Sequence, residues 1–437
     1  MEPLSIGIMS VGLMVLAIVL GSHIGVALGI VSFLSFWLIK GNFCIALSLL
    51  GSTANTACME YILLVLPMFI LMGLFANLSG ASDDLYDATN AFLVRVRGGV
   101  GIATVLANAV FAAVTGSSAA SAAVFSKIAY PQMKRLGYET NFSLGTIAGS
   151  SVLGMLIPPS GLLIIYGFLT EQSIGRLFIA GVIPGLLLTG IYVMGIWVMV
   201  RLNPKLAGKR GNRKDITTTK LMLTVFKPWI FGMLIFLVLG GIYLGWFTPV
   251  EAGAVGAFGA ILFSLVRGKI TLSKLWDLLL DAGYTNASIF FLFIGAQMYA
   301  RVLSLSTLPV AISTYIASLN TSPFLVIVLF IIVFIILGAI LDSISILLIT
   351  MPIMFPIIDS LGFDPIWFGI VSIIAIEMGL ITPPFGICVY IIKSSIGEEI
   401  TIEQGFRGSF PFLLMMVLAL VITALFPSLS TWLPGRM

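Results

Sequence analysis

The chain has 437 residues, of which 59% are hydrophobic and only 9% are charged, and its formal net charge is +4. This composition is typical of a membrane protein and argues against a large soluble core. The positive charges gather in loops, which indicates membrane topology rather than nucleic-acid binding. The sequence has no Walker loop and no dinucleotide fingerprint, so we do not expect ATP-driven pumping.

Apolar runs of about twenty residues, long enough to cross a bilayer, recur along the chain. A less apolar stretch at 43–58 is predicted to lie along the membrane interface, and 82–94 to form an amphipathic helix on the membrane surface. A second amphipathic stretch covers 271–283. The predicted spans, in chain order, are near 4–20, 24–40, 61–78, 177–200, 229–247, 249–266, 286–305 and 409–434.

A hairpin is predicted at about 98–133, where small polar residues, Thr115 to Ser118, interrupt a long apolar run. Arg95 and Arg97 precede this run and Lys134 and Arg135 follow it, so both ends are expected on one side of the membrane. We therefore predict a re-entrant hairpin with its tip inside the bilayer. The alternative is an ordinary span with a Gly-Ser kink, which the flanking charges disfavour.

A broken helix is predicted at about 140–170, around Leu156-Ile157-Pro158-Pro159-Ser160-Gly161. Two consecutive prolines remove two backbone donors and clash with the preceding turn, so the segment cannot be one continuous helix. In a bilayer core, broken backbone survives only where it is buried in protein or lines a cavity. The break therefore indicates an ion or substrate site.

The same break recurs 225 residues later, as Ile381-Thr382-Pro383-Pro384-Phe385-Gly386. At this offset many proline, glycine and serine positions coincide without a gap over about a hundred residues, which is the scale of a repeat unit. The repeat predicts a second hairpin at about 322–358, with its tip at 341–345, and a second broken helix at about 365–395.

A strongly basic segment joins the two halves. Residues 201–227 carry eight Lys or Arg residues against one acid, Asp215, so this loop should be cytoplasmic. We predict a first repeat at 1–203, a linker at 204–227 and a second repeat at 228–437. Because an odd number of spans lies between the hairpins, the repeats should be inverted, with both chain ends outside the cytoplasm, as in many secondary transporters. The fold class expected is an all-α polytopic membrane protein.

Candidate ligands lie where each hairpin tip would meet its own broken helix. Hydroxyls, unwound carbonyls and one carboxylate are hard oxygen ligands, which suit a small cation such as Na⁺. We place Na⁺ at Ser117, Ser118, Asp342, Ser343 and Thr382 with nearby carbonyls. The full candidate set is Ser117, Ser118, Ser121, Pro158, Pro159, Ser160, Gly161, Asp342, Ser343, Ser345, Thr382, Pro383, Pro384 and Gly386.

Two acids lie in apolar surroundings, where charge is costly and indicates function by default. Asp342 is either an ion ligand or a cap that accepts backbone N–H groups at the hairpin tip, and both interpretations stay open. We interpret Glu377 as a structural hydrogen-bond or ion-pair partner inside the bundle. The cysteines Cys44, Cys58 and Cys388 show no metal or disulfide spacing, and the single His23 is expected to be a helix-turn residue.

These motifs resemble a known family, the large membrane subunit of tripartite ATP-independent periplasmic (TRAP) transporters, within the ion-transporter superfamily. The resemblance covers nearly the whole chain. The residues that carry it are Gly116 to Ala120, Ile128 to Tyr138, Leu156 to Ser160 and Gly379 to Gly386.

The resemblance implies an elevator transporter, in which a mobile domain slides against a scaffold, and Na⁺-coupled uptake of an organic acid across the bacterial inner membrane. It also implies two partners, a small membrane subunit and a periplasmic substrate-binding protein. Na⁺ would lie between Ser117–Ser118 and Pro158–Gly161, and between Asp342–Ser345 and Thr382–Gly386. Because the chain begins directly with a span, the small subunit is expected to be a separate polypeptide.

Three other functional classes are alternatives to a tripartite transporter. A stand-alone Na⁺- or H⁺-coupled organic-anion symporter or antiporter of the same superfamily would need no binding protein. An ion channel needs a continuous pore, which inverted broken repeats argue against. A membrane enzyme is not expected, since no nucleophile–base pair or metal cluster supports one.

Overall fold

The computed structural model describes the whole chain except residues 1, 94–95, 209–223, 225, 319–321 and 437. The described residues form helices and connecting turns and contain no strand. Much of the predicted basic linker, 204–227, lies outside the described residues. Among the described residues, six helices are long and apolar enough to cross a membrane, or seven if the bent pair around Pro158 counts as one span. This confirms the predicted all-α polytopic fold.

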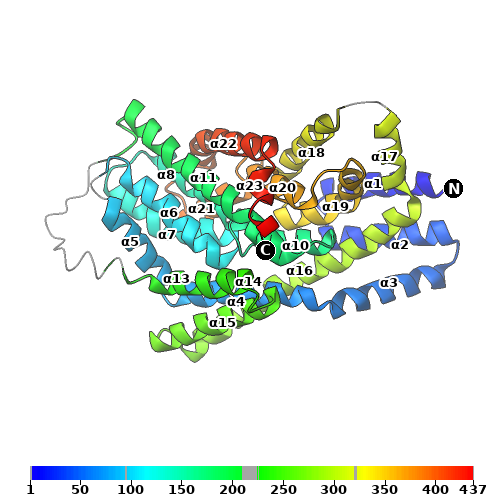
Figure 1. The fold of residues 1–437 in the computed structure, drawn as a ribbon, viewed down its shortest axis with the longest axis horizontal. Coiled ribbons are helices and arrows are strands. Elements are labelled where there is room, and N and C mark those ends of the chain that lie inside the picture. The colour runs from blue at the N-terminus through cyan, green and yellow to red at the C-terminus, as the bar shows by residue number, and fades with distance from the viewer. Residues whose placement is uncertain (1, 94–95, 209–223, 225, 319–321, 437) are drawn as a thin grey trace.

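One group of helices forms the right and lower part of the molecule in Figure 1. Helices α2 and α3 both pack along the long helix α16, and α4 packs along α15. The group comprises α1 (Pro3–Val19), α2 (Ile24–Lys40), α3 (Phe43–Met59), η1 (Tyr61–Leu64), α4 (Val65–Leu78), α13 (Trp229–Ile235), η3 (Phe236–Gly240), α14 (Gly241–Tyr243), α15 (Pro249–Val266), α16 (Leu272–Ser306) and α17 (Leu308–Ser318).

Small residues allow α4 and α15 to pack closely. A Cβ added to Gly256 would lie 2.5 Å from the sulfur of Met72 and 2.9 Å from a Val238 methyl group, so any larger residue would require these side chains to shift. Further along, the Ser264 hydroxyl donates a 2.7 Å hydrogen bond to the Phe75 carbonyl. Small residues that bring helix backbones together are typical of membrane helix packing.

The second group holds the hairpins and the broken helices. Helix α8 packs along α22, α7 packs on α8 and α21, and α18 packs on α20. The group comprises α5 (Ala81–Leu93), α6 (Gly99–Thr115), α7 (Ser118–Arg135), α8 (Thr140–Ser151), α9 (Leu153–Leu156), α10 (Gly161–Leu169), α11 (Ile174–Leu202), α18 (Pro323–Gly338), α19 (Ser343–Ser360), α20 (Pro365–Gly379), α21 (Ile387–Ile396), α22 (Ile402–Leu425), α23 (Ser428–Thr431) and η4 (Pro434–Arg436).

Two predicted boundaries were wrong. The amphipathic stretch 271–283 and the span 286–305 form one continuous helix, α16, because no proline or glycine pair interrupts the chain between them. The last span begins at Ile402 rather than 409, where Thr401 and Gln404 form a capping box, and it ends at Leu425 before Pro427.

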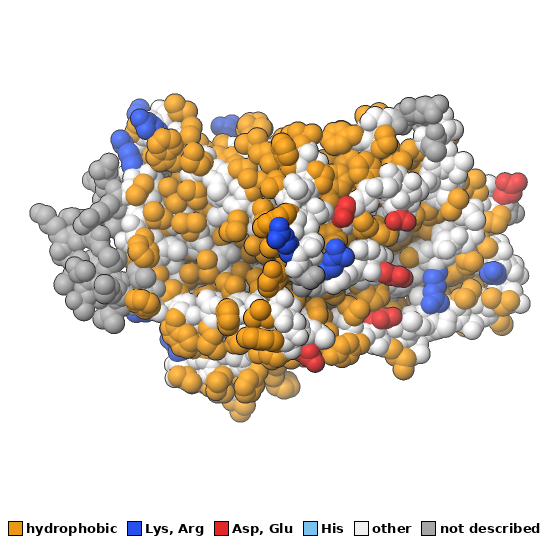
Figure 2. Space-filling view, viewed as in Figure 1, with side chains coloured by type: hydrophobic (Ala, Val, Ile, Leu, Met, Phe, Trp, Pro, Cys, Tyr) orange, Lys and Arg blue, Asp and Glu red, His pale blue; other side chains and the backbone are white. Residues whose placement is uncertain are grey.

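The surface of the molecule is strongly apolar, as the orange that covers much of the visible face in Figure 2 shows. Large side chains such as Phe258, Leu265 and Trp276 are more than half exposed. A soluble monomer rarely exposes contiguous apolar patches of this size. A bilayer would cover this surface.

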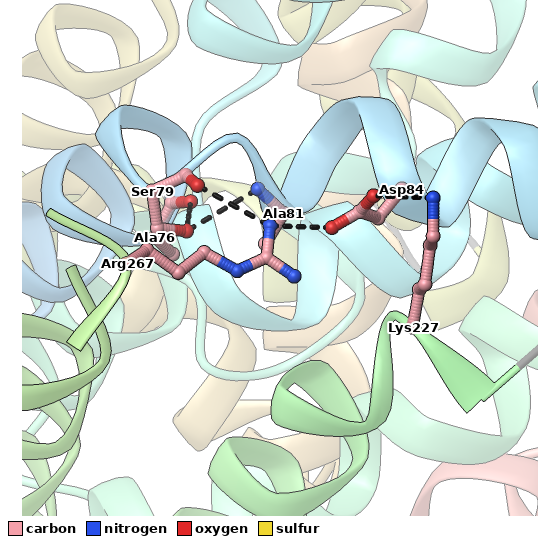
Figure 3. A network of polar contacts seen from close by, with 6 residues as sticks. All are labelled: Ala76, Ser79, Ala81, Asp84, Lys227 and Arg267. Carbon is pink, nitrogen blue, oxygen red and sulfur yellow. Dashed lines mark hydrogen bonds and ion pairs between the residues drawn. The ribbon is translucent and has the colours of Figure 1, made fainter. Parts of the chain in front are cut away.

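A polar network fixes the turn between α4 and α5 (Figure 3). Arg267, just after α15, lies 2.5 Å from an Asp84 carboxylate oxygen and donates a 3.4 Å hydrogen bond to the Ser79 carbonyl. Lys227 approaches the other Asp84 oxygen at 4.0 Å. The first turn of α5, which was predicted to lie on the membrane surface, is therefore acidic. Its Asp84 contacts a cation just before α13 and another just after α15.

Candidate functional site

Each hairpin turns at a capped helix start. Helix α6 ends at Thr115 and is capped by Gly116, whose φ of +57° favours glycine. Ser117 then caps α7 by accepting a 3.3 Å hydrogen bond from the Ala120 N–H. In the second hairpin Asp342 caps α19 and accepts from both the N–H and the hydroxyl of Ser345, at 3.1 and 2.5 Å. Ser117 and Asp342 stand at the 225-residue offset and have the same local role.

The first helix break is buried. Helix α9 ends at Leu156 and α10 begins at Gly161, and Pro158 and Pro159 between them lie among buried residues. Ser160 caps α10 and its hydroxyl also donates to the Met155 carbonyl, so the side chain bridges the break. The predicted interruption at the Pro-Pro pair is confirmed.

The second break is open by comparison. Helix α20 ends at Gly379 and α21 begins after Gly386, while Pro383 and Pro384 are exposed. The Thr382 hydroxyl donates a 2.7 Å hydrogen bond to the Met378 carbonyl. The two breaks share a sequence pattern but differ in their access to solvent in this structure.

Each hairpin tip contacts its own break through backbone. The Phe385 N–H donates a 3.1 Å hydrogen bond to the Ala339 carbonyl, and the Gly161 N–H approaches the Gly116 carbonyl at 3.5 Å. A Cβ added to Gly379 would lie 2.3 Å from the Gly338 Cα, and one added to Gly154 would lie 2.7 Å from the Ser117 carbonyl carbon. Both glycines are therefore required for this close approach.

A single buried carboxylate joins the two hairpins. Glu377 on α20 is 1% exposed and accepts hydrogen bonds from the Ser118 hydroxyl at 2.5 Å and the Ser343 hydroxyl at 2.8 Å. Ser118 and Ser343 are the first residues of α7 and α19, and they too stand at the 225-residue offset. The position one offset before Glu377 is Val152, so only one half supplies the acid.

Sequence reasoning found parts of this arrangement but did not join them. The hydrogen bond expected for Glu377 is present, yet its partners are two of the serines we had assigned to the ion site. Asp342 forms the predicted cap at the hairpin tip, and its role as an ion ligand stays a prediction. The sequence does show that Ser118 and Ser343 are related by the 225-residue offset. It also places Glu377 two residues before Gly379, the glycine at the second break. Nothing in the sequence states that the two tips meet at one helix.

Several buried oxygen atoms near the hairpins have no hydrogen-bond partner among the described residues. The Ser121 hydroxyl, on the first turn of α7, is one of them, and the Asn108 amide oxygen on α6 is another. Both side chains are fully buried. Unpaired buried oxygens are costly and call for a ligand, an ion or a water. Ser121 was predicted as a site residue, whereas Asn108 was missed.

A small cavity of about 160 Å³ lies beside the first hairpin tip. It is bounded by α4, α6, α7 and α16, and so lies between the two groups of helices. Its polar lining comes from Asn77, Thr115, Ser117 and Thr285. The tip residue Ser117 therefore faces both the backbone of its hairpin and a space shared with the first group.

Comparison with known proteins decides the family. A family model described as "Tripartite ATP-independent periplasmic transporter, DctM component" matches residues 11–429. The chain belongs to this family. It is 35% identical to the C4-dicarboxylate TRAP transporter large permease protein DctM of Pseudomonas aeruginosa, over 86% of this chain and 87% of the relative. It is 30% identical to the 2,3-diketo-L-gulonate TRAP transporter large permease protein YiaN of Escherichia coli, over 91% of each.

A third relative differs in length. The isethionate TRAP transporter permease protein DctMQ of Oleidesulfovibrio alaskensis is 28% identical over 97% of this chain but only 66% of its own length. Among solved structures, MtrF of Neisseria gonorrhoeae aligns with a TM-score of 0.59 and 12% identity over 98% of this chain and 95% of that one. The YdaH transporter of Alcanivorax borkumensis aligns with a TM-score of 0.56 and 15% identity over 87% of each chain. These similarities show the fold.

The TRAP family membership gives the chain its general role. It is the large permease subunit of a solute uptake system and a multi-pass membrane protein rather than an enzyme. The predicted resemblance to the TRAP large subunit is thereby confirmed.

Proposed function

We propose that this TRAP permease carries out Na⁺-coupled uptake of a small organic acid across the bacterial inner membrane by an elevator movement. A periplasmic substrate-binding protein would deliver the acid, and a small membrane subunit would complete the transporter. The observation that carries the proposal is the bridge from Ser118 and Ser343 to the buried Glu377 carboxylate. It places the two hairpin tips at one point inside the helical bundle.

The residues at this point fit a small hard cation. Ser117, Ser118, Asp342, Ser343 and Thr382 supply hydroxyl or carboxylate oxygens, and the broken backbone adds carbonyls. The N-termini of α7 and α19, at Ser118 and Ser343, meet at the Glu377 carboxylate. Helices α9 and α20 end at the two breaks, where their C-terminal carbonyls favour a cation. The unpaired Ser121 hydroxyl is consistent with an oxygen ligand set that is completed by an ion.

The substrate class follows from the relatives. Their names specify a C4-dicarboxylate, 2,3-diketo-L-gulonate, sialic acid and isethionate, all of which are organic acids. In a tripartite system, the soluble binding protein selects the solute before it reaches the membrane. We therefore propose an organic acid as the class and leave selection among acids to the partner.

The test is uptake into proteoliposomes that contain this chain and its small subunit. Labelled acids of the four classes are added with their loaded binding protein, with and without an inward Na⁺ gradient. We expect uptake only when the binding protein and the Na⁺ gradient are both present. A matched gradient of K⁺ in place of Na⁺ controls for membrane potential.

Two outcomes would contradict the proposal. Uptake at the same rate without the binding protein would indicate a stand-alone symporter or antiporter of the same superfamily. Uptake that requires the binding protein but is equal in Na⁺ and K⁺ would retain the tripartite assembly and remove Na⁺ coupling.

A further inference from the structure

A basic pocket of about 660 Å³ lies between the end of α7 and the end of α21, away from the hairpin tips. Three cations line it, Lys127, Lys134 and Arg135, against one acid, Glu399. The Tyr130 ring and the Ser126 and Ser395 side chains complete its polar wall. Its lining therefore has an excess of two positive charges.

Two of these cations are free to bind a ligand. Lys134 lies 2.5 Å from Glu399, in a pair whose side chains are both more than half exposed. Lys127 and Arg135 are exposed, and among the described residues neither forms a hydrogen bond or an ion pair. Lys127 stands two turns before Lys134 on α7, so the pocket presents charge along one face of the helix.

An apolar groove continues from this pocket. A second cavity of about 450 Å³ runs along α21 and shares Ser395 with the basic pocket. Its apolar walls come from Ile340, Phe385, Ile387, Tyr390 and Ile391. Its lining on α21 runs from Ile387 to Ser395, which is about 12 Å of helix. The basic pocket and the apolar groove therefore adjoin at Ser395 and together offer an amphipathic surface.

We propose that this site binds an anionic glycerophospholipid. The phosphate would sit between Lys127 and Arg135, and an acyl chain would lie in the groove along α21. Basic pockets between transmembrane helices on the cytoplasmic side suit lipid phosphates, and the charges that flank the first hairpin predict that side here. A small hydrophilic acid would gain nothing from the apolar walls. The proposal does not depend on Na⁺ coupling or on the elevator movement.

The site would matter for transport because of what it touches. Helix α7 is the second half of the first hairpin, and α21 is the second half of the second broken helix. A lipid seated across them would hold together elements from both halves of the chain. Phe385 and Ile340 in the groove also border the second tip and break.

The experiment is calorimetric titration of the purified full chain, in a neutral detergent, with dioctanoyl-phosphatidylglycerol. Dioctanoyl-phosphatidylcholine tests the requirement for net negative charge, glycerol 1-phosphate the headgroup alone, and succinate a small dicarboxylate. We expect saturable binding of the phosphatidylglycerol and weaker binding of the other three. The double variant K127A/R135A should bind it about tenfold more weakly, because two charge-assisted contacts are lost.

Matched variants distinguish binding at this pocket from non-specific attraction to the positive charge of the protein surface. The double variant K40A/K274A removes two exposed lysines on α2 and α16, in the other helix group, and should leave affinity within about twofold. Glu399→Gln frees Lys134 and should tighten binding. Ser395→Trp fills the junction between pocket and groove, and should weaken phosphatidylglycerol binding while leaving glycerol 1-phosphate unchanged. Thermal unfolding of each variant verifies that it is folded.

The proposal is overturned if K127A/R135A and the wild type bind phosphatidylglycerol equally well, or if Glu399→Gln weakens binding. It is also overturned if succinate binds more tightly than the lipid and depends on the same two cations. That last result would make the pocket a cytoplasmic mouth for the transported acid.

Discussion

At the scale of single residues, the shared carboxylate of Glu377 is the contact on which the site depends. Replacement of Glu377 by Ala leaves the Ser118 and Ser343 hydroxyls unpaired and opens a cavity in a fully buried region. We expect a loss of about 2–4 kcal/mol in the free energy of unfolding, measured by thermal unfolding in detergent. Glu377→Gln keeps one acceptor and should lose less stability, while uptake should fall in both.

The control lies on the same helix. The Ser372 hydroxyl is buried on α20 and has no partner among the described residues, so Ser372→Ala should change stability little. If Glu377→Ala and Ser372→Ala unfold at the same temperature, the carboxylate does not hold the tips together.

The two serines should be energetically coupled to Glu377. Ser118→Ala and Ser343→Ala each remove one hydrogen bond to the carboxylate and should each cost roughly 1.5–3 kcal/mol, as bonds to charged groups do. In a Glu377→Ala background the same substitutions should cost much less, since the bond is already absent. A double-mutant cycle on unfolding free energies measures the difference. Additive costs would show that the serines act independently of Glu377.

At the scale of elements, close backbone approach positions each hairpin against its broken helix. Gly379→Ala would force α18 away from α20, because the added Cβ would lie 2.3 Å from the Gly338 Cα. We expect a cost of about 1–3 kcal/mol in unfolding free energy and a loss of uptake. Gly190→Ala on α11 meets open space and serves as the control. Wild-type uptake by Gly379→Ala would show that the approach is not needed.

The turn between α4 and α5 depends on a different interaction. Asp84→Asn breaks the partly buried pair with Arg267, whose side chains are 16% and 27% exposed respectively. We expect this change to lower the unfolding free energy by roughly 1–2 kcal/mol, since a partly buried cation is left unpaired. Glu403→Gln breaks an exposed pair with Arg407 and should have little effect. Chemical denaturation of both variants at low salt compares them, and equal midpoints would contradict the expectation.

At the scale of the whole molecule, features set by local residues could be predicted from the sequence, whereas contacts that depend on helix packing could not. The Pro158-Pro159 and Pro383-Pro384 pairs marked both breaks, because two consecutive prolines remove two backbone donors and clash with the preceding turn. Single prolines do not have this effect here, since Pro131 and Pro184 lie inside the continuous helices α7 and α11. The join of 271–283 to 286–305 was missed because hydropathy changes there without any residue that ends a helix. The meeting of Ser118 and Ser343 at Glu377 could not be predicted, because contacts between distant segments depend on how helices pack. The unpaired Asn108 was missed for the same reason.

The proposed elevator movement leads to a prediction about the boundary between the two helix groups. Gly73 on α4 faces Thr115 at the end of α6, and a Cβ on Gly73 would lie 3.4 Å from the Thr115 Cβ. That separation is close to the Cβ–Cβ distance of a disulfide. If the first hairpin slides past α4 during transport, the oxidised double variant Gly73→Cys/Thr115→Cys should lose uptake and regain it on reduction.

The background for this test replaces Cys44, Cys58 and Cys388, the three native cysteines, so that only the new pair can react. Each single-cysteine variant controls for the substitution itself, which matters because Gly73 packs tightly against the Thr115 backbone. An elevator requires the two groups to move several ångströms relative to each other, and a disulfide of about 2 Å between its sulfurs prevents such movement. Full uptake by a cross-linked protein would therefore mean that α4 and α6 travel together, and that the moving boundary lies elsewhere in the fold.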